Sequence, residues 1–310
     1  MAHKDALMAA TTANPKVAPV YLVGAGPGDP GLLTLHALQA IEQAELIMVD
    51  ALVSAPVRAL IPKGVRIVEV GKRCGQHSMS QTQIEQQLIQ FARQGLKVVR
   101  LKGGDAMVFG RVGEEMQALR AAAIPYQVIP GVTAASAASA YGAMPLTLRG
   151  VAAGVSFISG HQCGASTEVV SATADAPSQL VTSLSATAAR GQRASNGVDW
   201  AQYVLPNHTL VIYMGLQQAD NIAEGLLAAG MAPQTPLALV RNASLAEQVQ
   251  WQGTLANLSA LAEHVRQQEV QGPTILIIGE VVRQADALAW FNDAQNQTMA
   301  LGASCFKWAM

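Results

Sequence analysis

Charged side chains follow the ends of several short apolar runs in this sequence. Asp50, Lys72 and Asp105 each come within four residues of such a run. A carboxylate can accept a proton and an ammonium group can donate one, so these residues could carry out proton transfer. Each also has a simpler explanation: Asp50 can cap a helix, and Lys72 with Arg73 can form a solvated surface pair. Because ligands of α/β proteins gather at the carboxyl ends of strands, the recurrence of charges there indicates a site.

A glycine-rich loop precedes these residues. Residues 23–31 read V-G-A-G-P-G-D-P-G and hold four glycines and two prolines. The segment 26–31 satisfies the dinucleotide pattern G-x-G-x-x-G, and Asp50 lies about 20 residues further on, where a ribose-binding acid would stand. Phosphate, however, is bound by backbone N–H groups, and Pro27 and Pro30 have none. The loop therefore predicts close backbone contact with a ligand that carries no large phosphate charge.

A second glycine turn and three charged residues are further candidates. Residues 101–105 read L-K-G-G-D, which would let backbone approach a ligand or would form an ordinary tight turn. Arg111, Glu114 and Arg149 could bind an anionic ligand or be exposed charges. Their position after the predicted strands favours the first interpretation only in combination with the other features.

Other kinds of site find less support. His161 and Cys163 form an H-x-C pair, but two ligands without a third predict no metal site. Met214-Gly215 follows an apolar run and could pack in the core or contact a flat ligand. A nucleophile elbow G-x-S-x-G and a P-loop are both absent from the sequence. The sequence therefore does not predict nucleophilic hydrolysis or P-loop nucleotide chemistry.

The composition describes a globular protein. Half of the 310 residues are hydrophobic and 13% are charged, with a formal net charge of −1. Such a charge balance predicts no nucleic-acid partner, and no apolar run reaches the ~18 residues of a membrane span. The first 19 residues lack the apolar stretch of a secretory signal. Three scattered cysteines predict no disulfide framework, so we expect a cytoplasmic protein.

Apolar runs alternate with helical patterns along the chain. Ser80 with Gln83 forms a capping box before an amphipathic pattern, and a helix of small residues is expected over 134–141. Strands are expected over residues 20–23, 46–49, 65–70, 97–101, 155–158, 210–214, 237–240 and 274–278. Strand–helix alternation of this kind predicts the α/β class with a parallel or mixed sheet.

The same pattern predicts two domains. Pro145 disfavours continuation of the preceding helix and marks the junction. We expect a flexible tail over 1–17, an N-terminal α/β domain over 18–146, a C-terminal α/β domain over 147–283 and a C-terminal tail over 284–310. An Ala/Ser-rich insertion over 164–196, in which a loose helix could form, interrupts the second domain.

Eight motifs occur in a fixed order along the chain. They are V-x-x-V-G-A-G-P-G-D-P-G-L-L-T-L at 20–35, V-G-K-R-C-G at 70–75, R-L-K-G-G-D at 100–105, F-G-R at 109–111, P-G-V-T-A-A-S at 130–136, P-L-T at 145–147, Y-M-G-L at 213–216 and G-E-V-V at 279–282. In this order the chain resembles the tetrapyrrole methylases, particularly those that methylate uroporphyrinogen III. The resemblance covers about residues 20–282 and is highly specific.

The resemblance implies two α/β domains with S-adenosylmethionine in the cleft between them, usually as a homodimer and without a metal. This methyl donor has a sulfonium and a small zwitterion but no phosphate, which suits the proline-containing loop. Carried over position by position, the residues that would bind the methyl donor are Pro27, Gly103, Gly104, Asp105, Val108, Thr133, Ala134, Met214 and Ala243.

The resemblance also implies the acceptor and the reaction. The acceptor would be uroporphyrinogen III, methylated at C2 and C7 to give precorrin-2 for sirohaem or cobalamin-type tetrapyrroles. Its eight carboxylates require cations with bidentate reach. The implied substrate-binding residues are Arg111, Glu114, Arg149 and His161, and those implied in proton transfer or catalysis are Asp50, Lys72 and Arg111.

Several positions depart from the family pattern. Ala51 stands where an arginine is usual, and Leu148 and Gly150 replace the usual His and Asp of P-L-T-H-R-D. Two other interpretations therefore remain open. A methylase of the same fold could act on a different acceptor, such as a later precorrin or a compound that is not a tetrapyrrole. Alternatively, the chain could be a non-catalytic protein that binds the methyl donor or a tetrapyrrole.

Overall fold

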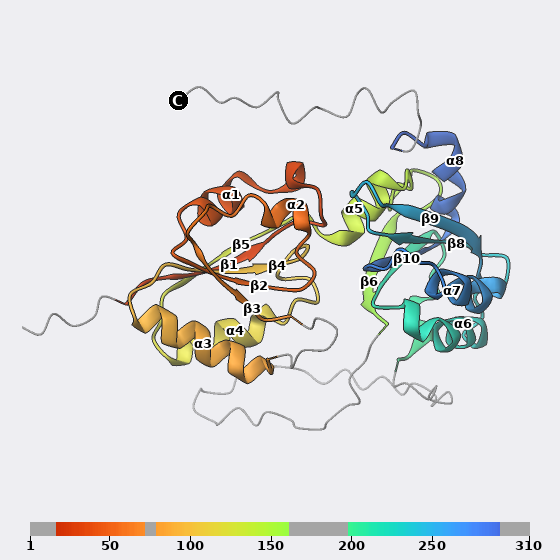
Figure 1. Ribbon diagram of the computed structural model, residues 1–310. Helices are drawn as coiled ribbons and strands as arrows, with labels where there is room; N and C mark the ends of the chain where they lie inside the picture. Colours follow the sequence, from red (N-terminus) through yellow and green to blue (C-terminus); the bar gives the residue numbers. More distant parts are fainter. Residues whose placement is uncertain (1–16, 72–78, 161–197, 292–310) are drawn as a thin grey trace, which may run out of the picture. The chain divides into compact units, whose positions relative to one another are not determined.

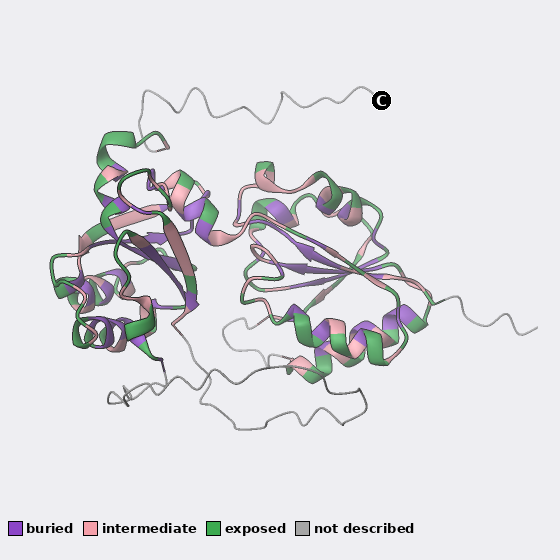
Figure 2. Ribbon diagram, turned by 180° about the vertical axis from the view of Figure 1, so that it is seen from behind, coloured by how far each residue is buried: buried purple, intermediate pink, exposed green. Residues whose placement is uncertain are grey.

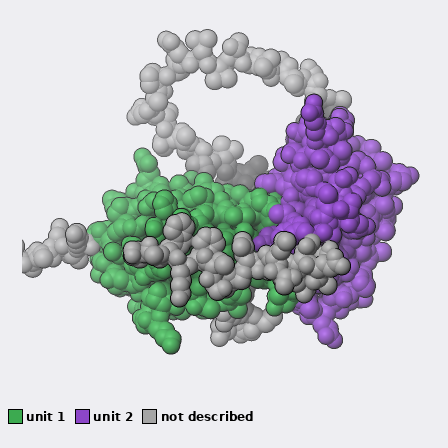
Figure 3. Space-filling model, turned by 90° about the horizontal axis from the view of Figure 1, so that it is seen from above, with its two compact units in different colours: residues 1–138, 242–248 green, residues 139–241, 249–310 purple. Residues whose placement is uncertain are grey.

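The computed structural model describes residues 17–71, 79–160 and 198–291 (Figure 1). The chain divides into two compact units, one of residues 1–138 with 242–248 and the other of residues 139–241 with 249–310 (Figure 3). The boundary falls within helix α5 (Ala134–Tyr141), a few residues before the junction expected at Pro145. The expected insertion over 164–196 and most of the expected N-terminal tail lie outside the described residues.

The first unit is built on a parallel sheet in the order β3-β2-β4-β1-β5. Its strands are β1 (Val20–Gly24), β2 (Leu46–Val49), β3 (Arg66–Glu69), β4 (Val98–Lys102) and β5 (Tyr126–Ile129). All neighbouring pairs run in the same direction. Continuous apolar runs such as Leu46–Val49 suit strands that are covered on both faces. The sheet thus brings the carboxyl ends of β1, β2 and β4 to one edge.

Helices cover both faces of this sheet (Figure 1). Helices α1 (Leu35–Glu42) and α2 (Ala55–Arg58) lie on one side, and α3 (Gln81–Arg93) and α4 (Val112–Ala121) on the other; a 3₁₀ turn, η1 (Pro30–Leu32), precedes α1. Each face has its own apolar core. In Figure 2 the strands are mostly buried, whereas the outer sides of the helices are exposed.

Side-chain caps fix where these helices begin. The capping box predicted for α3 is confirmed, because Ser80 Oγ accepts from Gln83 N and the Gln83 side chain accepts from Ser80 N. Helix α2 is capped by Ser54, whose hydroxyl accepts from Val57 N at 3.3 Å. Asp50 is therefore not the cap of the helix that follows it, which was one of its two interpretations.

The second unit contains a mixed sheet in the order β6-β7-β10-β8-β9. Its strands are β6 (Gly154–Ser159), β7 (His208–Tyr213), β8 (Pro236–Arg241), β9 (Val249–Thr254) and β10 (Thr274–Ile278). Strands β6 and β7 pair in parallel, and the other neighbours are antiparallel. Strand β9 was not predicted, because its polar alternation V-Q-W-Q-G-T lacks a continuous apolar run.

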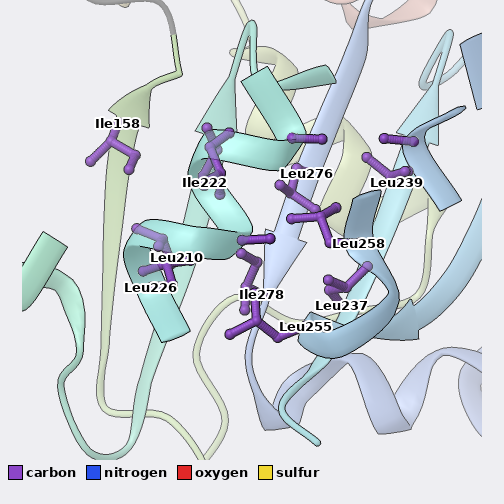
Figure 4. Packing of buried hydrophobic residues seen from close by; sticks show 14 of the residues in the cluster. Ile158, Leu210, Ile222, Leu226, Leu237, Leu239, Leu255, Leu258, Leu276 and Ile278 are labelled. Atoms are coloured by element: carbon purple, nitrogen blue, oxygen red, sulfur yellow. The ribbon is translucent and has the colours of Figure 1, made fainter. Parts of the chain in front are cut away.

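Helices α6 (Ala219–Ala228) and α7 (Leu258–Arg266) pack on this sheet through leucine and isoleucine side chains (Figure 4). The described part of this unit also contains the 3₁₀ turns η2 (Trp200–Tyr203), η3 (Leu216–Gln218), η4 (Leu255–Asn257) and η5 (Glu280–Gln284). A short helix, α8 (Ala285–Leu288), lies within the range that the sequence assigned to a C-terminal tail. No helix in the described ranges is long and apolar enough to cross a membrane.

Candidate functional site

Three glycines pack backbone against backbone at the carboxyl edge of the first sheet. Gly24 ends β1, Gly104 follows β4 and Gly131 follows β5. A Cβ atom on Gly24 would lie 2.6 Å from Gly131 N and 2.8 Å from Gly104 O, and one on Gly131 would lie 2.5 Å from Gly104 O. Real Cβ atoms do not approach so closely, so only glycine fits at Gly24 and Gly131. This packing draws the two predicted glycine loops together.

Hydrogen bonds hold the two loops in register. Gly26 N donates to Gly104 O at 3.1 Å, and Gly104 N donates to Gly26 O at 2.7 Å. Both residues have left-handed φ angles, +70° and +68°. The space beside Gly104 is open, since a Cβ there would find only Ala134 N, at 3.7 Å. The Cα of Gly104 is therefore open to close contact with a ligand, while its N–H and C=O are bonded to Gly26.

Asp105 braces the turn after β4 against the turn after β5. Its Oδ1 accepts from Met107 N at 2.7 Å and its Oδ2 accepts from Gly131 N at 3.4 Å. Each carboxylate oxygen has a second lone pair, so the same group can still accept a hydrogen bond from a ligand. Asp105 is half-buried, which strengthens its attraction for a cation such as a sulfonium or an amino group.

The segment Asn242–Gln248 returns from the second unit's sheet to the first unit and packs on the glycine-rich loop. Ser244 Oγ accepts from Asp29 N at 3.2 Å, and Leu245 lies against Gly28 so closely that a Cβ there would clash at 2.7 Å. Asn242 and Ser244 both have positive φ, +53° and +73°, on either side of the buried Ala243. The segment is thus fixed in a strained conformation beside the loop.

The structure brings together most of the residues expected to bind the methyl donor. Those of the first unit are Pro27, Gly103, Gly104, Asp105, Val108, Thr133 and Ala243, which lie outside its helices and strands, and Ala134, which begins α5. Their roles stay predictions. Met214 belongs to the second unit, where it follows β7 with φ +54° and a side chain that is 52% exposed. The first-unit loops suit a ligand without phosphate, because they offer bare backbone and one carboxylate.

Asp50 lies at the end of β2 and belongs to a group of charged side chains. Its Oδ1 accepts from Ala51 N at 2.8 Å, and its Oδ2 accepts from Arg100 Nη2 at 3.4 Å. Arg58 Nη2 donates to the Asp50 backbone oxygen at 2.7 Å. The carboxylate is half-buried, so it is both held in place and able to meet a ligand.

Behind Asp50 lies a buried charged network of Arg100, Lys102 and Glu115. Arg100 and Lys102 are two residues apart on β4 and follow Val98 on the face that α3 and α4 cover. Arg100 Nε donates to Glu115 Oε1 at 3.1 Å, and Lys102 Nζ donates to the same oxygen at 2.8 Å. Arg100 is 2% exposed and Glu115 is 0% exposed.

Burial lowers the pKa of Lys102 below its usual value, and the nearby charge of Arg100 acts in the same direction. Glu115 and Asp50 oppose this shift, Glu115 both by charge and by hydrogen bonding. We did not predict these three residues as a group. The alternation V-V-R-L-K could have pointed to Arg100 and Lys102, because charges inside an apolar strand require a buried partner, but it does not name Glu115 as that partner.

The residues expected to bind the substrate differ in setting. Arg111 directly precedes α4, with φ +55°, and pairs with Glu114, which lowers the pKa of that carboxyl. Both side chains are exposed. Arg149 is exposed at the tip of a turn closed by Leu148 and Ala152, in which Gly150 has φ +80°. A left-handed φ explains why glycine suits this position.

Two predicted site residues, Lys72 and His161, lie outside the described residues, as does Cys163. Within the described ranges no group of three or more His, Cys, Asp or Glu side chains could hold a metal ion.

Comparisons with known proteins agree on one family. Residues 19–259 match the family described as Tetrapyrrole (Corrin/Porphyrin) Methylases. A siroheme synthase of Zymomonas mobilis is 43% identical over 279 residues, which is 90% of this chain and 52% of that protein. A siroheme synthase of Psychromonas ingrahamii is 43% identical over 88% of this chain and 50% of its own length. The chain thus spans about half the length of the curated relatives it matches.

Solved structures give the same picture. The uroporphyrin-III C-methyltransferase of Thermus thermophilus, solved with S-adenosylhomocysteine, is 35% identical, with a TM-score of 0.64 over 86% of this chain and 99% of that one. A cobalt precorrin-4 methyltransferase of cobalamin biosynthesis shares the fold at 20% identity, with a TM-score of 0.65. The two-unit α/β fold predicted from the sequence is therefore confirmed.

Proposed function

The chain belongs to the tetrapyrrole methylases, and on that basis we propose that it methylates uroporphyrinogen III at C2 and C7, with S-adenosylmethionine as methyl donor, to give precorrin-2. The observation that carries this proposal is the 35% identity to the Thermus thermophilus enzyme over nearly the whole of that protein. The siroheme synthases that match this chain support the same branch of tetrapyrrole chemistry.

The methyl donor would be held by the glycine loops of the first unit. When bound, S-adenosylmethionine supplies an electrophilic methyl group on a positively charged sulfur. Gly103 and Gly104 would offer bare backbone, Asp105 a carboxylate, and Ala243 an apolar wall. Because these groups are already fixed by the Gly26–Gly104 hydrogen bonds, little reorganisation is needed on binding.

The acceptor would be held by cations. Uroporphyrinogen III carries eight carboxylates, and guanidinium groups bind carboxylates through two parallel hydrogen bonds. Arg111 already makes such a contact with Glu114, so a substrate carboxylate would compete with Glu114 for Arg111. Arg149 makes no hydrogen bond or ion pair to another described residue and is exposed, so it can turn toward a ligand.

Proton transfer would follow the formation of the new carbon–carbon bond. A pyrrole carbon is electron-rich enough to attack the methyl group in line, so alignment and exclusion of water supply most of the rate. The methylated ring system must then lose a proton. Asp50 is the group best placed to accept it, because its carboxylate is held by Ala51 N and Arg100 and is half-exposed. Lys72 is the second candidate for proton transfer.

A two-substrate assay tests the proposal. Purified protein, S-adenosylmethionine and enzymatically generated uroporphyrinogen III should yield a product heavier by two methyl groups. The S-adenosylhomocysteine released should be two equivalents per macrocycle. Binding of the methyl donor without any methylated product, while the acceptor stays intact, would contradict the proposed reaction.

A second candidate function keeps the fold and changes the acceptor. It is favoured by Ala51, which is exposed after Asp50 and provides no cation where the family usually has arginine. Under this alternative, later precorrins or compounds that are not tetrapyrroles would be methylated and uroporphyrinogen III would not. A non-catalytic binding protein would bind the methyl donor and methylate none of these acceptors.

A further inference from the structure

The buried network behind Asp50 has no assigned role in the proposed reaction. Arg100, Lys102 and Glu115 are all buried, and with Asp50 they place two cations beside two anions in the first unit. Removing ionised groups from water is costly unless each finds a partner. A replacement by apolar side chains would often be as stable, so stability alone does not account for this arrangement.

Glu115 is the centre of the network. Its Oε1 accepts from Arg100 Nε, from Lys102 Nζ and, at 3.4 Å, from Gln81 Nε2 of helix α3. Its Oε2 is buried and has no hydrogen-bond partner among the described residues. One oxygen therefore carries all the hydrogen bonds of this carboxylate, and the buried oxygen without a partner calls for an explanation other than stability.

Arg100 connects Glu115 to Asp50. Its Nε faces Glu115, its Nη2 faces Asp50 Oδ2, and its Nη1 donates to the Leu101 backbone oxygen at 3.3 Å. The guanidinium is planar and rigid, so fixing its Nε edge also fixes the edge that holds Asp50. The position of the Asp50 carboxylate thus depends on Glu115, although the two carboxylates share no direct contact.

We propose that Glu115 is a positioning residue for Asp50: acting through Arg100 and balancing Lys102, it holds the Asp50 carboxylate in place and keeps the charge around it neutral. This inference rests on the proposed function, in which Asp50 accepts a proton. The described charged groups that face Lys102 are Arg100 on its own strand, Asp50 after β2, and Glu114 and Glu115 on α4.

The substitution Glu115→Gln gives this role a distinctive pH dependence. It keeps the shape of the side chain but removes the anion that Arg100 and Lys102 share, so the Asp50 carboxylate faces a net excess of positive charge and becomes a poorer proton acceptor. Losing Glu115 also removes two influences that raise the pKa of Lys102, so that pKa falls further. At higher pH Lys102 then loses its proton, and the original charge balance returns.

The experiment measures kcat and KM between pH 6.5 and pH 9 for three proteins: wild type, Glu115→Gln, and the double variant that combines Lys102→Met with Glu115→Gln. For each variant, kcat is divided by the wild-type kcat at the same pH, and this quotient is the kcat ratio. At pH 7 we expect Glu115→Gln to lower kcat by about tenfold or more, with KM for S-adenosylmethionine changed by less than about twofold. The ratio should rise with pH. The amide oxygen introduced by Glu115→Gln can still accept from Arg100 Nε, so the double variant, which has no net charge change, should recover most of the kcat lost in Glu115→Gln and lose its pH dependence.

The controls separate this proposal from folding and from the proposed function. Glu263→Gln removes the exposed partner of the Arg266–Glu263 pair in the second unit, and its kcat and KM should both stay equal to those of wild type. Calorimetric binding of S-adenosylhomocysteine reports whether each variant is folded. If Glu115→Gln does not fold, the double variant decides, since a folded but inactive double variant overturns the proposal.

The outcomes remain distinct. An inactive wild type overturns the proposed function and this inference together. An active wild type with a Glu115→Gln ratio that is independent of pH, or that Lys102→Met does not restore, overturns the inference alone.

Discussion

At the scale of single residues, the most consequential departure from the family is Ala51. Its side chain is exposed and directly follows Asp50, so a longer side chain can be accommodated. Ala51→Arg should strengthen binding of a polycarboxylate by about 0.5–1 kcal/mol, because a partly solvated pair contributes little more than that. This corresponds to a KM for uroporphyrinogen III about two- to fivefold lower. Steady-state kinetics checks it, with Ala121→Arg on α4 as a charge-matched control.

An unchanged KM in Ala51→Arg would show that this position does not meet a substrate carboxylate. If the variant and the wild type are both inactive on uroporphyrinogen III while both bind the methyl donor, the alternative acceptor gains support.

Gly131 provides a second test at this scale. Its φ is not left-handed, so an alanine there is excluded only by the Gly104 and Gly24 backbones 2.5–2.8 Å away. Gly131→Ala should destabilise the protein by about 1–3 kcal/mol and weaken binding of the methyl donor, since the loops must separate. Gly113→Ala on α4 is the matched control, because a Cβ there meets nothing within 4 Å and helix propensity favours alanine. Urea unfolding measures the stability of both variants, and calorimetry measures their binding of the methyl donor. If Gly131→Ala were as stable and bound as tightly as Gly113→Ala, the close packing of Gly131 against Gly24 and Gly104 would be contradicted.

At the scale of elements, the strands with continuous apolar runs could be predicted to within two residues, as could α5 and the start of α3. These elements have local sequence signals: Leu46–Val49 is apolar throughout, and Ser80 with Gln83 forms a capping box that predicts the start of a helix. Helix α4 was missed, because the residue at its N-cap, Arg111, makes no side-chain capping hydrogen bond. The candidate site was predicted through its loops. The charges within V-V-R-L-K could have indicated that Arg100 and Lys102 need a buried partner, but no local pattern reveals that this partner is Glu115 on α4.

The burial of Lys102 within β4 has a consequence for stability. Its pKa is lowered by folding, so between that pKa and the usual 10.5 the unfolded chain binds more protons than the folded one. The free energy of unfolding of the wild type should therefore rise relative to that of Lys102→Met as the pH rises through this window. Below the window, the wild type should bear the full cost of burying the ammonium group. Urea unfolding of both proteins at pH 7, 8, 9 and 10 measures the difference. The exposed Lys63→Met should show no such trend; a flat difference for Lys102→Met would mean that its charge is not penalised.

At the scale of the whole molecule, the first unit is not continuous in sequence. Residues 242–248 lie between β8 and β9 along the chain but belong to the first unit. There Ser244 accepts a hydrogen bond from Asp29 N, and the Leu245 side chain packs against Gly28. A fragment that ends at residue 138 keeps every strand of the first sheet but loses these supports for the glycine-rich loop. We expect it to bind S-adenosylhomocysteine at least about tenfold more weakly than the full chain, since a loop that must be ordered on binding costs affinity.

Leu245→Ala in the full chain separates loss of the segment from incomplete folding of a fragment. It removes only the side chain that covers Gly28, so it should weaken S-adenosylhomocysteine binding several-fold, by about 1 kcal/mol, with a smaller loss of stability. The half-exposed Leu205→Ala in the second unit should leave binding unchanged. Calorimetry on the three proteins checks the order: the fragment should bind most weakly, Leu245→Ala next, and the control like wild type. If Leu245→Ala binds like wild type, the segment does not fix the loop, and the continuous part of the first unit is sufficient to form it.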